Sequence, residues 1–203
     1  MKRVFYTMFI FVFLASVNVN AQNVFDQNDP DVIFTSSNQP PIPSYYVLSK
    51  WGHSTKLSWN SYSYGYKSYF FMGTPFRIKY PKTYQQGVND GKKYPVYIFL
   101  HGAGETGDYW NNDIQLVHGG QTHANHVDNG DFDGYLIYPQ SPTPFSTAIL
   151  PKVNQLLDSM AKYCKVDVDR VIVGGLSSGG TSTYTFLADS PKSWAAVTPI
   201  STA

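Results

Sequence analysis

The sequence has little cysteine, no excess of charge of either sign and only a short hydrophobic run at its N-terminus. Cys164 is the only cysteine among 203 residues, so no disulfide can form within the chain. Lysine and arginine number 15 against 14 aspartate and glutamate, and this balance gives no electrostatic support for nucleic-acid binding. The apolar run Val4–Val17 is shorter than the about 20 residues that a transmembrane helix needs.

The sequence does contain enough apolar material for one globular domain. Hydrophobic residues make up 42% of the chain and charged residues 14%, a composition unlike that of disordered or collagen-like chains. The length matches a single domain with at most one small appendage.

The N-terminus predicts a signal for export. Lys2 and Arg3 give it a positive start, Val4–Val17 forms the apolar stretch, and a Val-Asn-Ala cleavage pattern ends at Ala21. We expect a cleaved signal peptide over residues 1–21 in preference to a retained N-terminal anchor. The mature protein would then be secreted or periplasmic, with no membrane segment after cleavage.

Residues 22–68 predict an irregular lead-in to the main domain. They are rich in Asn, Ser, Pro and Tyr, and the segment Gln39–Pro43 holds prolines that remove backbone donors and restrict the preceding residues. Aromatic residues of the lead-in suit either a sugar-stacking surface or packing onto the main domain, and packing is the favoured interpretation. These residues are Trp51, Trp59, Tyr62, Tyr64 and Tyr66.

Strand and helix patterns alternate over residues 69–203. Such alternation implies crossover connections, so we predict an α/β fold with a mostly parallel sheet flanked by helices. A turn is expected at Asp167–Asp169, before the fourth strand. The predicted strands are Phe76–Tyr80, Val96–Leu100, Tyr135–Tyr138, Val171–Val173 and Ala195–Val197, and the predicted helices are Ile149–Cys164, with Pro151 in its first turn, and Thr181–Asp189.

A nucleophile motif lies between the fourth strand and the second helix. Gly175-Leu176-Ser177-Ser178-Gly179 matches G-x-S-x-G, and glycines two positions before and after Ser177 allow the sharp strand-to-helix turn that exposes a hydroxyl. The following helix N-terminus favours developing negative charge. We therefore predict that Ser177 is the catalytic nucleophile, the alternative being a structural tight turn.

A second motif follows the strand Val96–Leu100. Acyl transfer needs two backbone donors for the carbonyl oxygen as it becomes an oxyanion, one after the nucleophile and one from a loop after an earlier strand. We predict that the N–H groups of Ser178 and Ala103 form this oxyanion hole. The residues His101, Gly102 and Gly104, together with Gly175 and Gly179, would support the two turns.

These motifs resemble those of secreted esterases of the α/β-hydrolase superfamily, and most closely the polyhydroxybutyrate depolymerase-like and feruloyl esterase-like branch. The resemblance covers roughly residues 74–203. It implies a serine hydrolase that cleaves carboxylic esters through an acyl-enzyme, without a cofactor or a metal. The segments that carry the resemblance are Tyr94-Pro95, Phe99–Glu105, Val168–Val171 and Gly174–Gly180.

The chain departs from this resemblance after Ser177. The superfamily places its acid and base after the nucleophile, in the order Ser, Asp or Glu, His. Only 26 residues follow Ser177 here; Asp189, late in a predicted helix, is the only acidic one, and none is histidine. A serine without a base is a poor nucleophile. We therefore expect residues 69–203 to be the N-terminal part of a hydrolase domain, truncated after the strand that follows the elbow helix, with little or no activity.

The residues that follow the glycine loop argue against a dinucleotide-binding site. Gly102–Gly107 also matches G-x-G-x-x-G, which requires a helix opening at the glycines and an acidic residue at the end of a second strand. Residues 108–128 show no sustained helical stripe, and Asp128 follows no apolar run.

Two further segments suggest metal ligands without matching a metal motif. His118, His123 and His126 have no standard zinc spacing, and we expect them on a surface loop. Residues 129–134 resemble a calcium loop, but Gln140 stands where the bidentate Glu belongs, so we interpret them as a turn.

Two alternatives to an esterase stay open. One is a secreted, non-catalytic hydrolase-like protein that binds a polymer or a partner through the aromatic lead-in. The other is a prolyl-oligopeptidase-like peptidase, which shares the elbow. For an esterase, feruloyl or acetyl esters on plant polysaccharide, polyhydroxyalkanoates and small acyl esters are all candidate substrates.

Overall fold

A computed structural model describes residues 25–28, 33–34, 37–42, 49–50, 53–54, 64–191 and 193–202. The predicted signal peptide lies outside these residues, as do Trp51, Trp59 and Tyr62. No helix in the described part of the chain combines the length and hydrophobicity that crossing a membrane requires.

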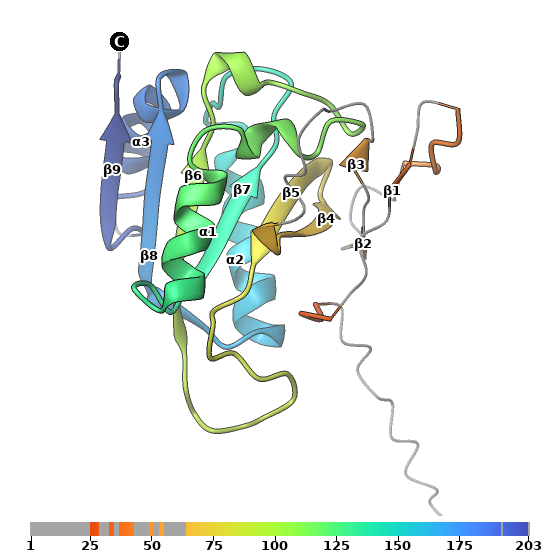
Figure 1. Ribbon diagram of the computed structural model, residues 1–203. Coiled ribbons are helices and arrows are strands. Elements are labelled where there is room, and N and C mark those ends of the chain that lie inside the picture. The colour runs from red at the N-terminus through yellow and green to blue at the C-terminus, as the bar shows by residue number, and fades with distance from the viewer. Residues whose placement is uncertain are drawn as a thin grey trace, which may run out of the picture.

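Seven strands form one mixed sheet in the order β2-β4-β5-β7-β6-β8-β9 (Figure 1). The strands β7, β6, β8 and β9 are parallel, whereas β2, β4 and β5 run antiparallel at the other side of the sheet. The strands of this sheet are β2 (Ser49–Lys50), β4 (Lys67–Phe71), β5 (Thr74–Lys79), β6 (Tyr94–Leu100), β7 (Tyr135–Pro139), β8 (Val166–Leu176) and β9 (Ala196–Ile200), and a separate parallel pair comprises β1 (Ile33–Phe34) and β3 (His53–Ser54).

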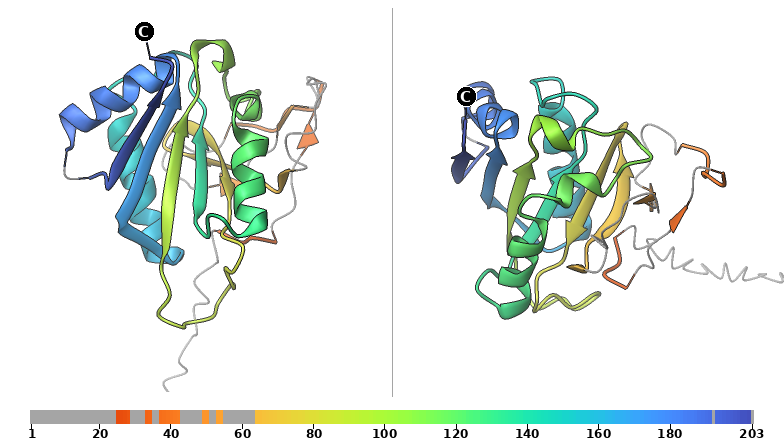
Figure 2. Two further views of the ribbon diagram at one scale, coloured as in Figure 1. Left: turned by 60° about the vertical axis from the view of Figure 1, so that its left-hand side comes forward. Right: turned by 45° about the horizontal axis from the view of Figure 1, so that its top comes forward.

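Three α-helices of the described chain connect the parallel strands: α1 (Gly120–Asn129), α2 (Leu150–Tyr163) and α3 (Ser178–Asp189). The helix α1 covers one face of the sheet, and α2 and α3 cover the other (Figure 2). Each crossover returns the chain so that the carboxyl ends of β6, β7, β8 and β9 meet at one edge. In an open α/β sheet this edge is where ligands bind.

The strand β6 contributes to both core layers. Its side chains alternate, so that Val96, Ile98 and Leu100 pack with α2, whereas Phe99 packs with α1. Burial on both faces confirms the interpretation of this apolar run as a central strand. On the face that α2 covers, Met160 of this helix is fully buried against the strand residues.

The predicted fold class is confirmed, and the structure adds the hairpin β4–β5 to it. Met72 and Gly73 link these strands with φ values of 48° and 76°. Two positive φ angles are the conformation of a two-residue hairpin turn, for which glycine is favoured. Tyr66, just before β4, packs edge-to-face on Tyr138 with ring centroids 5.4 Å apart, as the packing interpretation of the lead-in aromatics predicts for this residue.

Two local predictions are wrong. Residues 120–129 form helix α1, where no helix was expected, and its buried residues are only Gly120, Ala124 and Val127. His123 and His126 therefore lie on a helix instead of a surface loop. Asp167–Asp169 is also no turn, because β8 begins at Val166 and runs through it. Its pairing with β6 shifts register between Tyr94 and Val96, so residues 167–170 lie between the paired Val166 and Val171 and remain extended.

Candidate functional site

Ser177 occupies a strained turn at the carboxyl edge of the sheet. The strand β8 ends at Leu176, α3 begins at Ser178, and Ser177 between them has φ 55° and ψ −120°. Few residues other than glycine adopt such angles, and they cluster at functional sites. The Ser177 N–H donates to the Ile200 carbonyl oxygen (2.9 Å), and its own carbonyl accepts from the Thr181 N–H (3.0 Å). These bonds fix the backbone of Ser177, which is exposed at the carboxyl edge of the sheet.

The glycines on either side of Ser177 are required by close packing. A Cβ atom on Gly175 would lie 2.4 Å from the Gly179 carbonyl oxygen, and one on Gly179 would lie 2.1 Å from the Leu100 carbonyl oxygen. Both contacts are to backbone atoms, which cannot swing aside. The turn therefore forms only because residues 175 and 179 carry no side chain.

The structure brings the glycine loop after β6 next to Ser177. A Cβ atom on Gly102 would lie 3.5 Å from the Ser177 Cβ and 3.4 Å from the Leu176 carbonyl oxygen. Ala103, the next residue, is exposed and opens the short 3₁₀ helix η2 (Ala103–Glu105). Gly104 differs from its neighbours, since a Cβ there would meet no atom within 4 Å.

His101 holds this loop through both of its ring nitrogens. The Ser141 N–H donates to Nε2 (3.2 Å), so Nε2 carries no proton, and the Nδ1–H donates to the Gly102 carbonyl oxygen (2.8 Å). The side chain is buried against the ring of Phe145, and burial lowers the pKa of His101. A neutral His101 with its proton on Nδ1 is therefore a support for the loop.

Free backbone N–H groups lie on both sides of Ser177. The first N–H groups of a helix have no partner within that helix, and for α3 these include the N–H of Ser178. On the other side, the Ala103 N–H donates no hydrogen bond to any residue that the structure describes. The two groups predicted as oxyanion donors are thus both available to a ligand atom.

Glu105 was not predicted as a site residue. Its carboxylate is buried, with Oε1 3.3 Å from His118 Nε2 and Oε2 2.9 Å from the position of a Cβ on Gly102. Glu105 thus belongs to the same loop as Ala103, and its carboxylate packs against Gly102. The buried Gln140, which contacts this loop from the end of β7, was likewise not predicted.

No described residue is placed as the base for Ser177. Its hydroxyl forms no hydrogen bond with the described side chains, and Asp189 is exposed at the end of α3. The imidazoles of residues 118–126 are engaged elsewhere: His118 pairs with Glu105, His123 contacts the Tyr138 hydroxyl, and His126 pairs with Asp131 (3.0 Å). Within the described ranges they do not converge into a metal-binding group.

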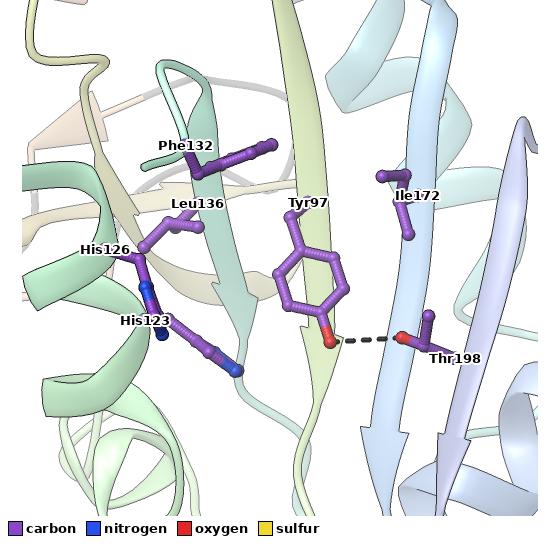
Figure 3. Close-up of a pocket in the computed structure, with 7 residues that line it drawn as sticks. All are labelled: Tyr97, His123, His126, Phe132, Leu136, Ile172 and Thr198. Atoms are coloured by element: carbon purple, nitrogen blue, oxygen red, sulfur yellow. Dashed lines mark hydrogen bonds between the residues drawn. The ribbon is translucent and has the colours of Figure 1, made fainter. Parts of the chain in front are cut away.

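A separate cavity of about 230 Å³ lies between α1 and the strands β6, β8 and β9 (Figure 3). The Tyr97 hydroxyl and Thr198 Oγ1, 3.1 Å apart, join β6 to β9 across it. None of the predicted site residues lines this cavity. Its lining residues are Tyr97, His123, His126, Phe132, Leu136, Ile172 and Thr198.

No family model and no curated protein matches the chain. Among solved structures, it is similar to one named FAE, with a TM-score of 0.50 and 16% identity over 68% of this chain and 53% of that one. It is also similar to the S-formylglutathione hydrolase FrmB from Staphylococcus aureus, with a TM-score of 0.50 and 14% identity over 64% of this chain and 52% of that one. A thermostable esterase gives a TM-score of 0.49 and 26% identity, over 62% of this chain and 36% of that one.

The chain thus spans about half or less of the length of these structures. The two likenesses at a TM-score of 0.50 are both under 25% identical, so they bear on the fold alone. On this evidence of topology and turn geometry, the chain has the α/β-hydrolase fold.

Proposed function

We propose that the chain is the nucleophile-bearing part of a secreted serine hydrolase that cleaves carboxylic esters. One observation carries this proposal: Ser177 is exposed in a positive-φ turn between β8 and α3, with the Gly102 loop against it. The α/β-hydrolase fold supports the same conclusion. The resemblance of the two motifs to depolymerase-like and feruloyl esterase-like enzymes supports substrates linked to polysaccharide or polyester, and the N-terminal signal pattern supports action outside the cell.

The geometry suits acyl transfer through Ser177. Its hydroxyl oxygen would bond to the ester carbonyl carbon while the C=O electrons move onto the oxygen. That oxygen would accept hydrogen bonds from the N–H groups of Ala103 and Ser178. Expulsion of the alcohol would leave an acyl-enzyme for water to hydrolyse.

The hydroxyl proton of Ser177 must pass to a base in this reaction, and the described residues offer none. We therefore propose that the 203 residues alone have little or no esterase activity. A small base in solution, such as imidazole, can take this proton. Phosphonylation by a fluorophosphonate probe reports the reaction, because the probe needs the same nucleophile and the same donors.

The experiment measures probe labelling at increasing imidazole concentration. We expect slow labelling without imidazole, labelling that accelerates with its concentration, and no labelling of Ser177→Ala. Ser193→Ala is the matched control, because Ser193 precedes β9 and so lies at the opposite edge of the sheet. Labelling that persists in Ser177→Ala would assign the reaction to another residue.

The lack of a base beside Ser177 among the described residues also favours a second candidate function, a secreted hydrolase-like protein that binds without catalysis. The same measurement separates the two. A folded chain that stays unlabelled at every imidazole concentration would support the binding protein and contradict the hydrolase.

A further inference from the structure

Gln140 is a fully buried polar residue that joins the end of β7 to the loop after β6. We propose that Gln140 is a positioning residue of the oxyanion hole, which acts through Ser141 and His101 on the direction of the Ala103 N–H. The inference rests on the proposed hydrolase function. It adds to that function a residue that touches neither the substrate nor Ser177.

Every polar atom of the Gln140 side chain has a partner. Oε1 accepts the N–H of Ser141 (2.7 Å), while Nε2 donates to the Asn111 carbonyl oxygen (2.8 Å) and to Gln115 Oε1 (3.2 Å). These partners allow one orientation of the amide, because the opposite one would place its oxygen against two other oxygens. The Gln140 backbone N–H also donates to the Pro75 carbonyl oxygen (2.8 Å), which anchors the residue to β5.

The amide of Gln140 controls the N–H that fixes the His101 tautomer. Ser141 shares its N–H between Gln140 Oε1 (2.7 Å) and His101 Nε2 (3.2 Å). Because Nε2 accepts this bond, the ring proton stays on Nδ1 and donates to the Gly102 carbonyl oxygen. Loss of the Gln140 amide would remove one of the two partners that hold the Ser141 N–H in place, and this choice of tautomer would no longer be fixed.

The Gly102 carbonyl carries this constraint to the proposed oxyanion donor. The carbonyl of Gly102 and the N–H of Ala103 belong to one peptide group, which is planar. Holding the carbonyl toward His101 therefore directs the N–H of Ala103 the opposite way. A further bond from the Gly107 N–H to the Ser141 carbonyl oxygen (3.0 Å) ties the far end of the loop to the same residue.

The experiment compares Gln140→Met with the unsubstituted chain in two measurements. The first is the imidazole-assisted labelling of Ser177, which we expect to slow by about 10- to 100-fold because the donor is misdirected. The second is the ¹⁵N NMR signature of the His101 ring, which we expect to lose its predominant Nδ1–H form. The tautomer is a readout that a general loss of stability would leave unchanged.

Two further variants keep the test decisive. Gly107→Ala would place a Cβ 2.8 Å from Gln140 Nε2, and so displaces the amide without removing it, should Gln140→Met fail to fold. Val127→Ala is the control for a general loss of stability, because Val127 is a buried residue of α1, away from the loop. We expect the unsubstituted chain to be labelled fastest, Val127→Ala next, and the two loop variants most slowly.

Labelling of Gln140→Met or Gly107→Ala at the rate of Val127→Ala, or an unchanged His101 tautomer, would overturn the proposal. No labelling of the unsubstituted chain would instead contradict the hydrolase function, and the oxyanion role of Gln140 would fall with it. In that outcome an altered tautomer would show a structural lock only. The two failures are therefore distinguishable.

Discussion

Gly179 lies so close to β6 that a Cβ atom on it would be 2.1 Å from the carbonyl oxygen of Leu100. The carbonyl oxygen of His101 would be 2.5 Å from the same atom. The start of α3 is thus packed directly on the end of β6, from which the loop with Gly102 and Ala103 departs. Ser177 and the loop keep their relative position because no side chain separates these two segments.

We predict that Gly179→Ala destabilises the fold by about 3 kcal/mol, since backbone atoms must shift to admit the methyl group. The free energy of unfolding, measured in urea, checks this value. Gly104→Ala is the matched control, because a Cβ there meets nothing within 4 Å, and it should change stability by no more than about 0.5 kcal/mol. Equal losses in the two variants would contradict the packing argument.

Ala103→Pro should remove one of the two proposed oxyanion donors without disturbing the loop. Ala103 is the first residue of η2, and Gly102 before it is extended, with φ −76° and ψ 177°. Proline suits the first position of a helix and prefers an extended residue before it. The substitution also breaks no hydrogen bond among the described residues, because the Ala103 N–H donates none there.

We therefore expect the free energy of unfolding of Ala103→Pro to lie within about 0.5 kcal/mol of that of the unsubstituted chain. Its imidazole-assisted labelling should nevertheless be about 100-fold slower, the usual effect of losing one oxyanion donor. Ala103→Ser, which keeps the N–H, should be labelled at the original rate. If the proline and serine variants react equally fast, residue 103 donates nothing to the reaction.

The elements predicted correctly are those with strong apolar patterns. The strand β6 and the helix α2 each bury several large apolar side chains, so both have a clear apolar pattern in the sequence. By contrast, α1 buries only Gly120, Ala124 and Val127, too little apolar surface to make a stripe. The start of β8 is extended although Asp167 and Asp169 are polar, because Val166 and Val171 on either side pair with β6.

The candidate site divides in the same way. Ser177 and the glycines beside it could be predicted, because a sharp turn and a close backbone approach restrict which residues fit. Gln140 and Glu105 could not, since a polar residue in a connecting segment has no periodic pattern. Their burial arises from contacts between loops after different strands, which only the folded chain brings together.

The thiol of Cys164 should be unreactive in the folded protein. It is 4% exposed at the end of α2, and burial raises its pKa from 9.0 to about 12. At pH 8 this lowers the thiolate fraction by about 1000-fold relative to the unfolded chain, and thiolate is the reactive form. We expect a chromogenic disulfide reagent to modify the native chain about 1000-fold more slowly than the chain in concentrated urea. Rapid modification of the native state would show that the thiol is accessible.

Asp113 should make the stability of the protein depend on pH between about 4 and 6. Burial raises its pKa from 3.8 to about 6, against the opposing attraction of Arg77. Across this interval the unfolded carboxyl loses its proton while the folded one retains it, so stability falls as pH rises and levels off above both values. Relative to Asp113→Asn, the unsubstituted chain should therefore lose on the order of 3 kcal/mol from pH 4 to pH 7, measured by urea unfolding at each pH. Asp158→Asn, on the exposed face of α2, controls for the loss of one carboxyl. A difference that is constant with pH, or that grows in favour of the unsubstituted chain, would mean that Arg77 outweighs burial at this carboxyl.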